Sequence, residues 1–259
     1  MEKDPKQWIW WAIPVVVVLA AGAALYFGKR HKEPVAAPPE TTIVPPPAAP
    51  AAPQNYPIEP TASSDKPLPS LDGSDSPLQE SLAEIYGRSL EAFLVPKDLI
   101  RHIVVTIDNL PRKKTAVPHW PLKPTPGKLS VTNSNDPVLS ADNAARYAPL
   151  IQLVQTTDAK QIATIYRHYY PLFQQAYVDL GYPNGYFNNR LIEVIDHLLE
   201  TPQLSGDVKL TQPSVFYEYA DPTLEERSAG QKVLMRMGNA NAATVKTKLR
   251  ELRREVAKE

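Results

Sequence analysis

Residues 8–27 carry no charged side chain, and this run constrains the chain more than any other feature. In a helix that rises about 1.5 Å per residue, a segment of this length covers about 30 Å, the thickness of the hydrocarbon core of a bilayer. Tryptophans at its start and Tyr26 and Phe27 at its end are typical of the two membrane–water interfaces. The basic segment 29–32 then ends the run. We therefore predict a transmembrane helix over residues 8–27, with membrane lipid as its partner, after a short tail of residues 1–7.

Two features of this N-terminal region leave alternatives open. Residues 21–23, Ala-Gly-Ala, resemble a signal-peptidase site, so a cleaved secretory signal is the competing interpretation. The run is longer than the core of a usual signal and opens with bulky indoles, which favours a retained anchor. Basic residues lie on both sides of it, Lys3 and Lys6 before and the segment 29–32 after. Charge therefore does not decide the membrane orientation.

Proline dominates the next part of the chain. Residues 33–77 contain 13 prolines, and their few apolar side chains are scattered. Such a segment cannot bury enough apolar surface to offset the entropy of ordering it. We expect residues 28–77 to be a basic stop followed by a disordered, Pro/Ala-rich linker, whose prolines 45–47 could alternatively be a ligand for a groove-binding partner.

Composition limits the chemistry open to the chain. Its 259 residues include no cysteine, which removes disulfides, thiolate metal ligands and thiol nucleophiles. The ten glycines form no phosphate-binding loop, and no Gly-x-Ser-x-Gly elbow is present. Acidic and basic residues balance at 28 each, so no global field favours nucleic acid. We predict no cofactor, no nucleic-acid partner and no enzymatic activity.

Residues 78–259 read as a single, mainly α-helical domain with one or two short β-hairpins. Ser76 and Pro77 have the form of a helix cap followed by a proline in the first turn. Asp158 precedes the longest apolar stripe, which Gly181 ends, and the segment 182–185 reads as a tight turn.

Further elements follow from local patterns. The segments 128–132 and 137–140 alternate as strands of a hairpin, and the segments 208–210 and 215–219 are strand candidates. Asp221-Pro222 predicts the start of a helix that runs to Gly238, and another helix is expected from about Ala240.

Several stretches of this domain resemble a known family when they are taken together. They are Leu94-Val95-Pro96-Lys97-Asp98-Leu99-Ile100-Arg101, Thr106-Ile107-Asp108-Asn109-Leu110-Pro111-Arg112, Tyr182-Pro183-Asn184-Gly185-Tyr186-Phe187, Val194-Ile195-Asp196-His197-Leu198-Leu199 and Ala229-Gly230-Gln231-Lys232. As a set they are similar to an uncharacterised family of bacterial, membrane-anchored proteins that is catalogued only as a domain of unknown function. The resemblance covers about residues 78–259. It implies a single-pass inner-membrane protein with a periplasmic domain, and it supplies no activity and no site residues.

One helix carries a group of titratable side chains. Glu193 and His197 lie one turn apart on one face, with Asp196 beside them. They could form a carboxylate–imidazole acid/base pair or half of a metal site, but a zinc-protease helix needs two histidines. A surface charge pair is the simpler interpretation, and we predict no metal site.

The sequence therefore favours a membrane-tethered cell-envelope protein whose helical domain binds a protein or the cell wall without catalysis. An envelope hydrolase that uses Asp196, His197 and Glu193 is the alternative, and a cytoplasmic domain that touches anionic lipid is a third. The candidate interaction residues are Arg101, Asp108, Arg112, Tyr186, Asn188, Arg190, Glu193, Asp196 and His197.

Overall fold

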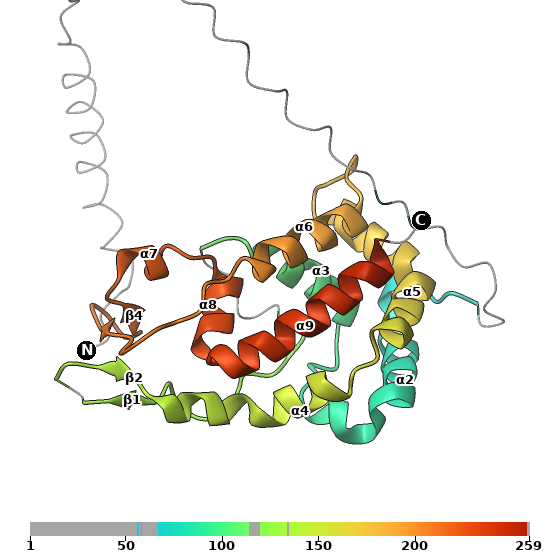
Figure 1. The fold of residues 1–259 in the computed structure, drawn as a ribbon. Coiled ribbons are helices and arrows are strands. Elements are labelled where there is room, and N and C mark those ends of the chain that lie inside the picture. The colour runs from blue at the N-terminus through green and yellow to red at the C-terminus, as the bar shows by residue number, and fades with distance from the viewer. Residues whose placement is uncertain (1–55, 57, 59–66, 114–119, 134, 258–259) are drawn as a thin grey trace, which may run out of the picture. The chain divides into compact units, whose positions relative to one another are not determined.

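The computed structural model describes residues 56, 58, 67–113, 120–133 and 135–257, all of which lie in a unit that spans residues 52–259. This unit is mainly helical, as predicted (Figure 1). Its α-helices are α2 (Asp75–Tyr86), α3 (Leu99–Asn109), α4 (Ala148–Thr156), α5 (Ala159–Asp179), α6 (Phe187–Leu199), α7 (Pro222–Glu225), α8 (Ala229–Arg236) and α9 (Asn239–Val256). Short 3-10 segments are η2 (Leu71–Gly73), η3 (Gly87–Ala92) and η5 (Ala141–Tyr147).

The predicted transmembrane helix over residues 8–27 lies outside the described residues, as does most of the predicted linker. The prediction of disorder is wrong for the end of that linker, because residues 71–77 include η2 and the start of α2, and Leu71 is buried in the main core. In the part of the chain that is described, no helix combines the length and the apolar character needed to cross a bilayer.

Helix α5 lies at the centre of the main core. It packs against α2, α3, α6 and α9, and α9 also contacts α4 and α8 (Figure 1). Most of the apolar stripe predicted for α5 is buried, including Tyr166, Phe173 and Tyr177, because residues three and four apart share one helix face. Its last member, Leu180, is 37% exposed. The Asp158 carboxylate accepts the backbone N–H of Lys160, which confirms the predicted cap of this helix.

Two short hairpins cover the other end of the unit. β1 (Val131–Thr132) pairs antiparallel with β2 (Val138–Leu139), and β3 (Leu210–Thr211) pairs antiparallel with β4 (Glu218–Tyr219). A single bridge between Val138 and Lys209 joins the two hairpins. Leu210, Tyr219 and Met235 form a small core beneath them. Both predicted hairpins are therefore present, although their strands are shorter than expected.

Two predicted helix limits are wrong. The helix expected to begin after a Ser76 cap begins earlier, at Asp75. The Asp75 carboxylate accepts hydrogen bonds from the backbone N–H groups of Asp98 and Leu99, at 2.8 and 2.9 Å. The helix expected to run from Pro222 to Gly238 is divided into α7 and α8. The division occurs because the Ser228 hydroxyl accepts the Gln231 N–H and so caps a new helix.

Candidate functional site

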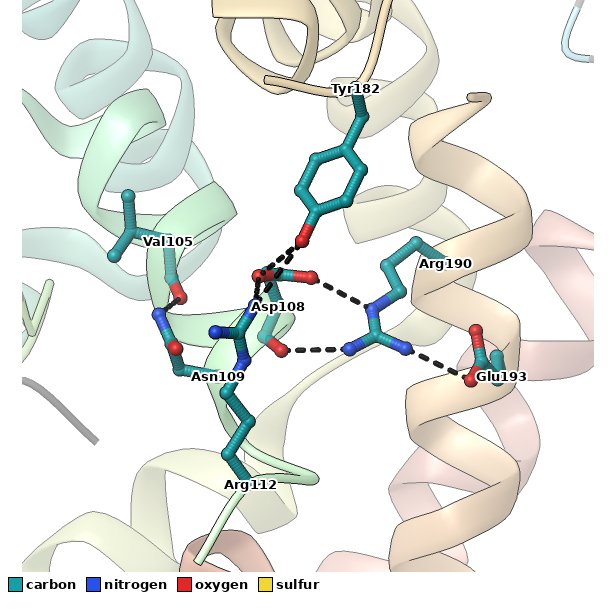
Figure 2. Close-up of polar contacts among 7 residues, drawn as sticks. All are labelled: Val105, Asp108, Asn109, Arg112, Tyr182, Arg190 and Glu193. Atoms are coloured by element: carbon teal, nitrogen blue, oxygen red, sulfur yellow. Dashed lines mark hydrogen bonds and ion pairs between the residues drawn. The ribbon is translucent and has the colours of Figure 1, made fainter. Parts of the chain in front are cut away.

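Asp108, in the last turn of α3, is the centre of a polar cluster. It is 3% exposed, and no other charged residue in the described ranges is buried to this extent. Its Oδ1 accepts Arg190 Nε at 3.1 Å, and its Oδ2 accepts Arg112 Nη2 at 2.6 Å and the Tyr182 hydroxyl at 3.2 Å (Figure 2). A buried carboxylate needs such partners, because an unpaired charge in the interior is strongly unfavourable.

The donors reach Asp108 from three separate parts of the fold. Arg112 follows α3, Tyr182 lies in the turn between α5 and α6, and Arg190 lies in the first turn of α6 (Figure 2). Arg190 Nη2 also donates to the backbone carbonyl of Asp108 at 2.8 Å, and Arg190 Nη1 pairs with Glu193 Oε1 at 2.9 Å. We call Asp108, Arg112, Tyr182, Arg190 and Glu193 the Asp108 cluster. It joins the end of α3 to the start of α6.

The turn between α5 and α6 places Tyr182. The chain leaves α5 through Gly181, at φ 113°, which suits glycine because it has no Cβ. The Tyr182 ring then stacks on that of Tyr177, with centroids 4.6 Å apart and planes 16° apart. A Cβ on Gly185 would lie 3.0 Å from the Tyr177 ring, so the turn closes tightly over this stack. The predicted turn is therefore confirmed, and it orients the hydroxyl that binds Asp108.

Exposure increases outward from Asp108. The side chain of Asp108 is 4% exposed and that of Arg190 18%, whereas those of Arg112 and Glu193 are 53% and 67% exposed. Burial acts to lower the pKa of Arg190, but Glu193 and Asp108 outweigh it, so the pKa lies above its ordinary value. Two acids balance two arginines, and the cluster carries no net charge.

This arrangement disfavours Asp108 as a general base, because the carboxylate is buried and already binds two guanidinium groups and a hydroxyl. Arg112 is different. Its Nη2 contacts Asp108 and Tyr182, while its Nε and Nη1 donate to no described residue. A guanidinium held in this way presents its remaining donors to a carboxylate or phosphate group.

Asp196 and His197 do not converge on one site. The Asp196 carboxylate accepts hydrogen bonds from Nε and Nη2 of Arg253 on α9, at 2.5 and 2.8 Å. His197 Nε2 lies 2.8 Å from the hydroxyl of Ser228, the residue that caps α8. Because neighbouring residues on a helix point in different directions, these two side chains connect α6 to two different helices.

The Ser228–His197 pair has the composition of a nucleophile and base, but the hydrogen bonds around it hold the start of α8 in place. Ser228 is 5% exposed, and its oxygen already accepts the Gln231 N–H. The neighbouring N–H groups of Ala229 and Gly230 donate to the carbonyls of Arg112 and Leu110, at 2.7 and 2.9 Å. The N–H groups of the two residues that follow Ser228 are therefore not available to an oxyanion.

The remaining predicted residues lie outside the Asp108 cluster. Arg101 pairs with Asp72 at 2.7 Å and with Asp98 at 3.2 Å on the surface. Asn188 is fully buried, donates to the carbonyls of Tyr56 and Val256, and accepts the Tyr166 hydroxyl. Tyr186 is 50% exposed at the start of α6.

The structure thus brings together four of the predicted residues, Asp108, Arg112, Arg190 and Glu193. Tyr182 belongs with them, although the sequence predicted it only as part of a tight turn. In the described ranges, no three His, Asp or Glu side chains converge as metal ligands would.

Comparison with protein-family models matches residues 99–253 to DUF3014, described as "Protein of unknown function (DUF3014)". The matched range contains every residue of the Asp108 cluster. Neither the curated proteins nor the solved structures contain a match to this chain.

Proposed function

We propose that this chain, which belongs to the DUF3014 family, is a membrane-tethered binding protein of the bacterial cell envelope. In this proposal its helical domain holds a protein or cell-wall partner and performs no catalysis. The observation that carries the proposal is the Arg112 guanidinium, which is half exposed and oriented by the buried Asp108. Because Asp108 and Tyr182 fix its position, Arg112 loses little conformational entropy when it binds an acidic group.

The turn that holds Tyr182 also exposes apolar side chains. Val178 and Leu180, at the end of α5, and Tyr186, at the start of α6, are 38%, 37% and 50% exposed. Arginine and tyrosine are enriched at the centres of protein interfaces, where an apolar body and a polar tip are both used. The α5–α6 turn, whose Tyr182 contacts Arg112, therefore has the composition of a binding surface.

The tether is inferred from the sequence. The uncharged run 8–27 has the length of a bilayer span, and the prolines of residues 33–77 are typical of a spacer. An inner-membrane anchor with the domain in the periplasm fits both features. The hydrolase alternative gains no support, since Asp196 and His197 bind different helices.

In-cell photocrosslinking tests the binding surface. A photoreactive phenylalanine analogue at Tyr186 should give a discrete crosslinked product in membranes, and Arg112→Ala should reduce its yield. Arg101→Ala is the matched control, because Arg101 is also a surface arginine held by two aspartates. Arg112→Lys keeps the charge and should give an intermediate yield.

Two outcomes would contradict the proposal. One is an undiminished product in an Arg112→Ala variant whose thermal unfolding shows that it is folded. The other is a phenotype that follows Asp196→Ala and His197→Ala in folded protein but not Arg112→Ala, which would favour the hydrolase. Because the chain has no cysteine, a single cysteine introduced at Glu226 and probed with a membrane-impermeant maleimide reports the side of the membrane.

A further inference from the structure

The loop between β3 and β4 exposes two adjacent apolar side chains. Val215 is 82% exposed and Phe216 77%, whereas the next most exposed large apolar side chain in the described ranges, Tyr186, is at 50%. Single exposed apolar residues are common on proteins, whereas an adjacent, bulky pair this exposed makes the loop a candidate contact site.

This loop is fastened at its base. Arg236 Nη2 donates to the carbonyl of Tyr217 at 3.2 Å, and Glu225 Oε2 accepts the backbone N–H of Tyr219 at 2.9 Å. Glu225 is in turn paired with Lys232, at 2.7 Å. These contacts join the hairpin to α7 and α8, which lie beside it in Figure 1.

The turn of the loop is also closed, since Gln212 Nε2 donates to the carbonyl of Val215 at 3.2 Å. The outward position of Val215 and Phe216 is therefore built into the hairpin. We call residues 212–217 the hairpin tip.

The hairpin tip has the chemistry of a segment that enters a membrane interface. Its sequence, Gln-Pro-Ser-Val-Phe-Tyr, carries no charge. Insertion would thus bury an aromatic ring and a branched aliphatic side chain without removing a charged group from water. Aromatic rings are enriched at the headgroup level of bilayers.

We propose that the hairpin tip inserts Val215 and Phe216 into the surface of the bilayer that anchors the same chain. The proposal rests on the tether of the proposed function. So small an apolar tip binds lipid weakly and reversibly by itself. A tether changes this, because it makes the second contact intramolecular and raises the local concentration of lipid surface. Docking of the tip would fix which face of the domain points away from the membrane.

The absence of cysteine from the chain permits a direct test with the full-length protein. Phe216→Cys is labelled with a polarity-sensitive fluorophore and reconstituted into vesicles of phosphatidylethanolamine and phosphatidylglycerol. Lys160→Cys, at an exposed position near the start of α5, is the matched control. Flotation of the vesicles is measured first, so that failure of the anchor is distinguished from failure of the tip.

In floated vesicles, the label at position 216 should be blue-shifted and should lose quenching by aqueous iodide, while the label at position 160 stays quenched. A label at Ser214→Cys should show the same protection and lose it when Val215→Ser and Phe216→Ser are added. Equal quenching at positions 216 and 160 would overturn the proposal. Protection that disappears as the lipid-to-protein ratio is raised would also overturn it, and would indicate contact between copies of the chain.

Discussion

Asp108 and Arg190 are 82 residues apart in the sequence and meet through two hydrogen bonds. Arg190 Nε donates to Asp108 Oδ1 at 3.1 Å, and Arg190 Nη2 donates to the Asp108 carbonyl at 2.8 Å. The second bond satisfies a carbonyl in the last turn of α3, which has no partner within the helix. One arginine on α6 therefore both neutralises a buried carboxylate and caps the helix that carries it.

Removing the buried carboxylate should strongly destabilise the domain. Asp108→Ala removes the buried counter-charge of Arg190, which is only 18% exposed, and leaves it with the exposed Glu193 alone. The change should lower the free energy of unfolding by about 3–5 kcal/mol. Urea unfolding followed by circular dichroism measures this. Asp72→Ala removes a carboxylate that is 84% exposed and should cost less than about 1 kcal/mol. Similar losses in the two variants would contradict a structural role for Asp108.

Gly230 should not tolerate a methyl group. A Cβ at this position would lie 2.6 Å from Leu198 Cδ2 and 3.2 Å from Leu110 Cβ. Gly230→Ala should therefore lower stability by about 1–3 kcal/mol through overpacking. In a Leu198→Ala background the same change should cost less, because the nearest atom is gone. Thermal unfolding of the four proteins gives this coupling, and an additive result would exclude the clash.

Asn188 should be a major determinant of stability, although its hydrogen-bond partners are a hydroxyl and two backbone carbonyls rather than charged groups. Its amide donates to the carbonyls of Tyr56 and Val256, both at 3.0 Å. Asn188→Ala leaves these groups and the Tyr166 hydroxyl without this partner, and should cost roughly 2–4 kcal/mol. The neighbouring Asn189→Ala, which removes an acceptor of the Tyr56 N–H, should cost less in the same urea titration.

Glu225 should make stability depend on acid pH. Burial acts to raise the pKa of Glu225, but hydrogen bonds from Lys232 and from the Tyr219 N–H, with nearby positive charge, lower it below 4.5. The resulting stabilisation is present above pH 4.5 and is lost as the pH falls through the folded-state pKa. Glu225→Gln should thus be less stable than the wild type at pH 7, by a difference that shrinks in acid.

Urea titrations at pH 7, 4.5 and 3 measure that difference for Glu225→Gln. Glu226→Gln removes the same charge from a side chain that is 74% exposed and serves as the control. A constant difference between wild type and Glu225→Gln over this range would show that Glu225 does not link stability to pH.

Local signals predicted much of the fold. Residues close together in the sequence predict the Asp158 cap, the apolar stripe of α5 and the turn at Tyr182. The structure has all three. The division between α7 and α8 was not predicted, because Asp221-Pro222 starts one helix and the Ser228 cap that starts another resembles an ordinary helical serine.

Only part of the candidate site could be predicted from the sequence. Arg190 and Glu193 lie three residues apart, so their pairing follows from helix geometry. Their connection to Asp108 depends on how α3 and α6 pack, which no local pattern specifies. Tyr182 shows the same limit, since it lies 74 residues from the carboxylate that it binds.

Helix α9 packs against α4, α5, α6 and α8, and all four precede it in the chain. Val256, near its end, is 1% exposed within the main core. The apolar faces that α9 covers must therefore stay open on the ribosome until residue 256 has been synthesised and has cleared the exit tunnel. A nascent chain of this kind exposes apolar surface that chaperones bind until synthesis of α9 is complete.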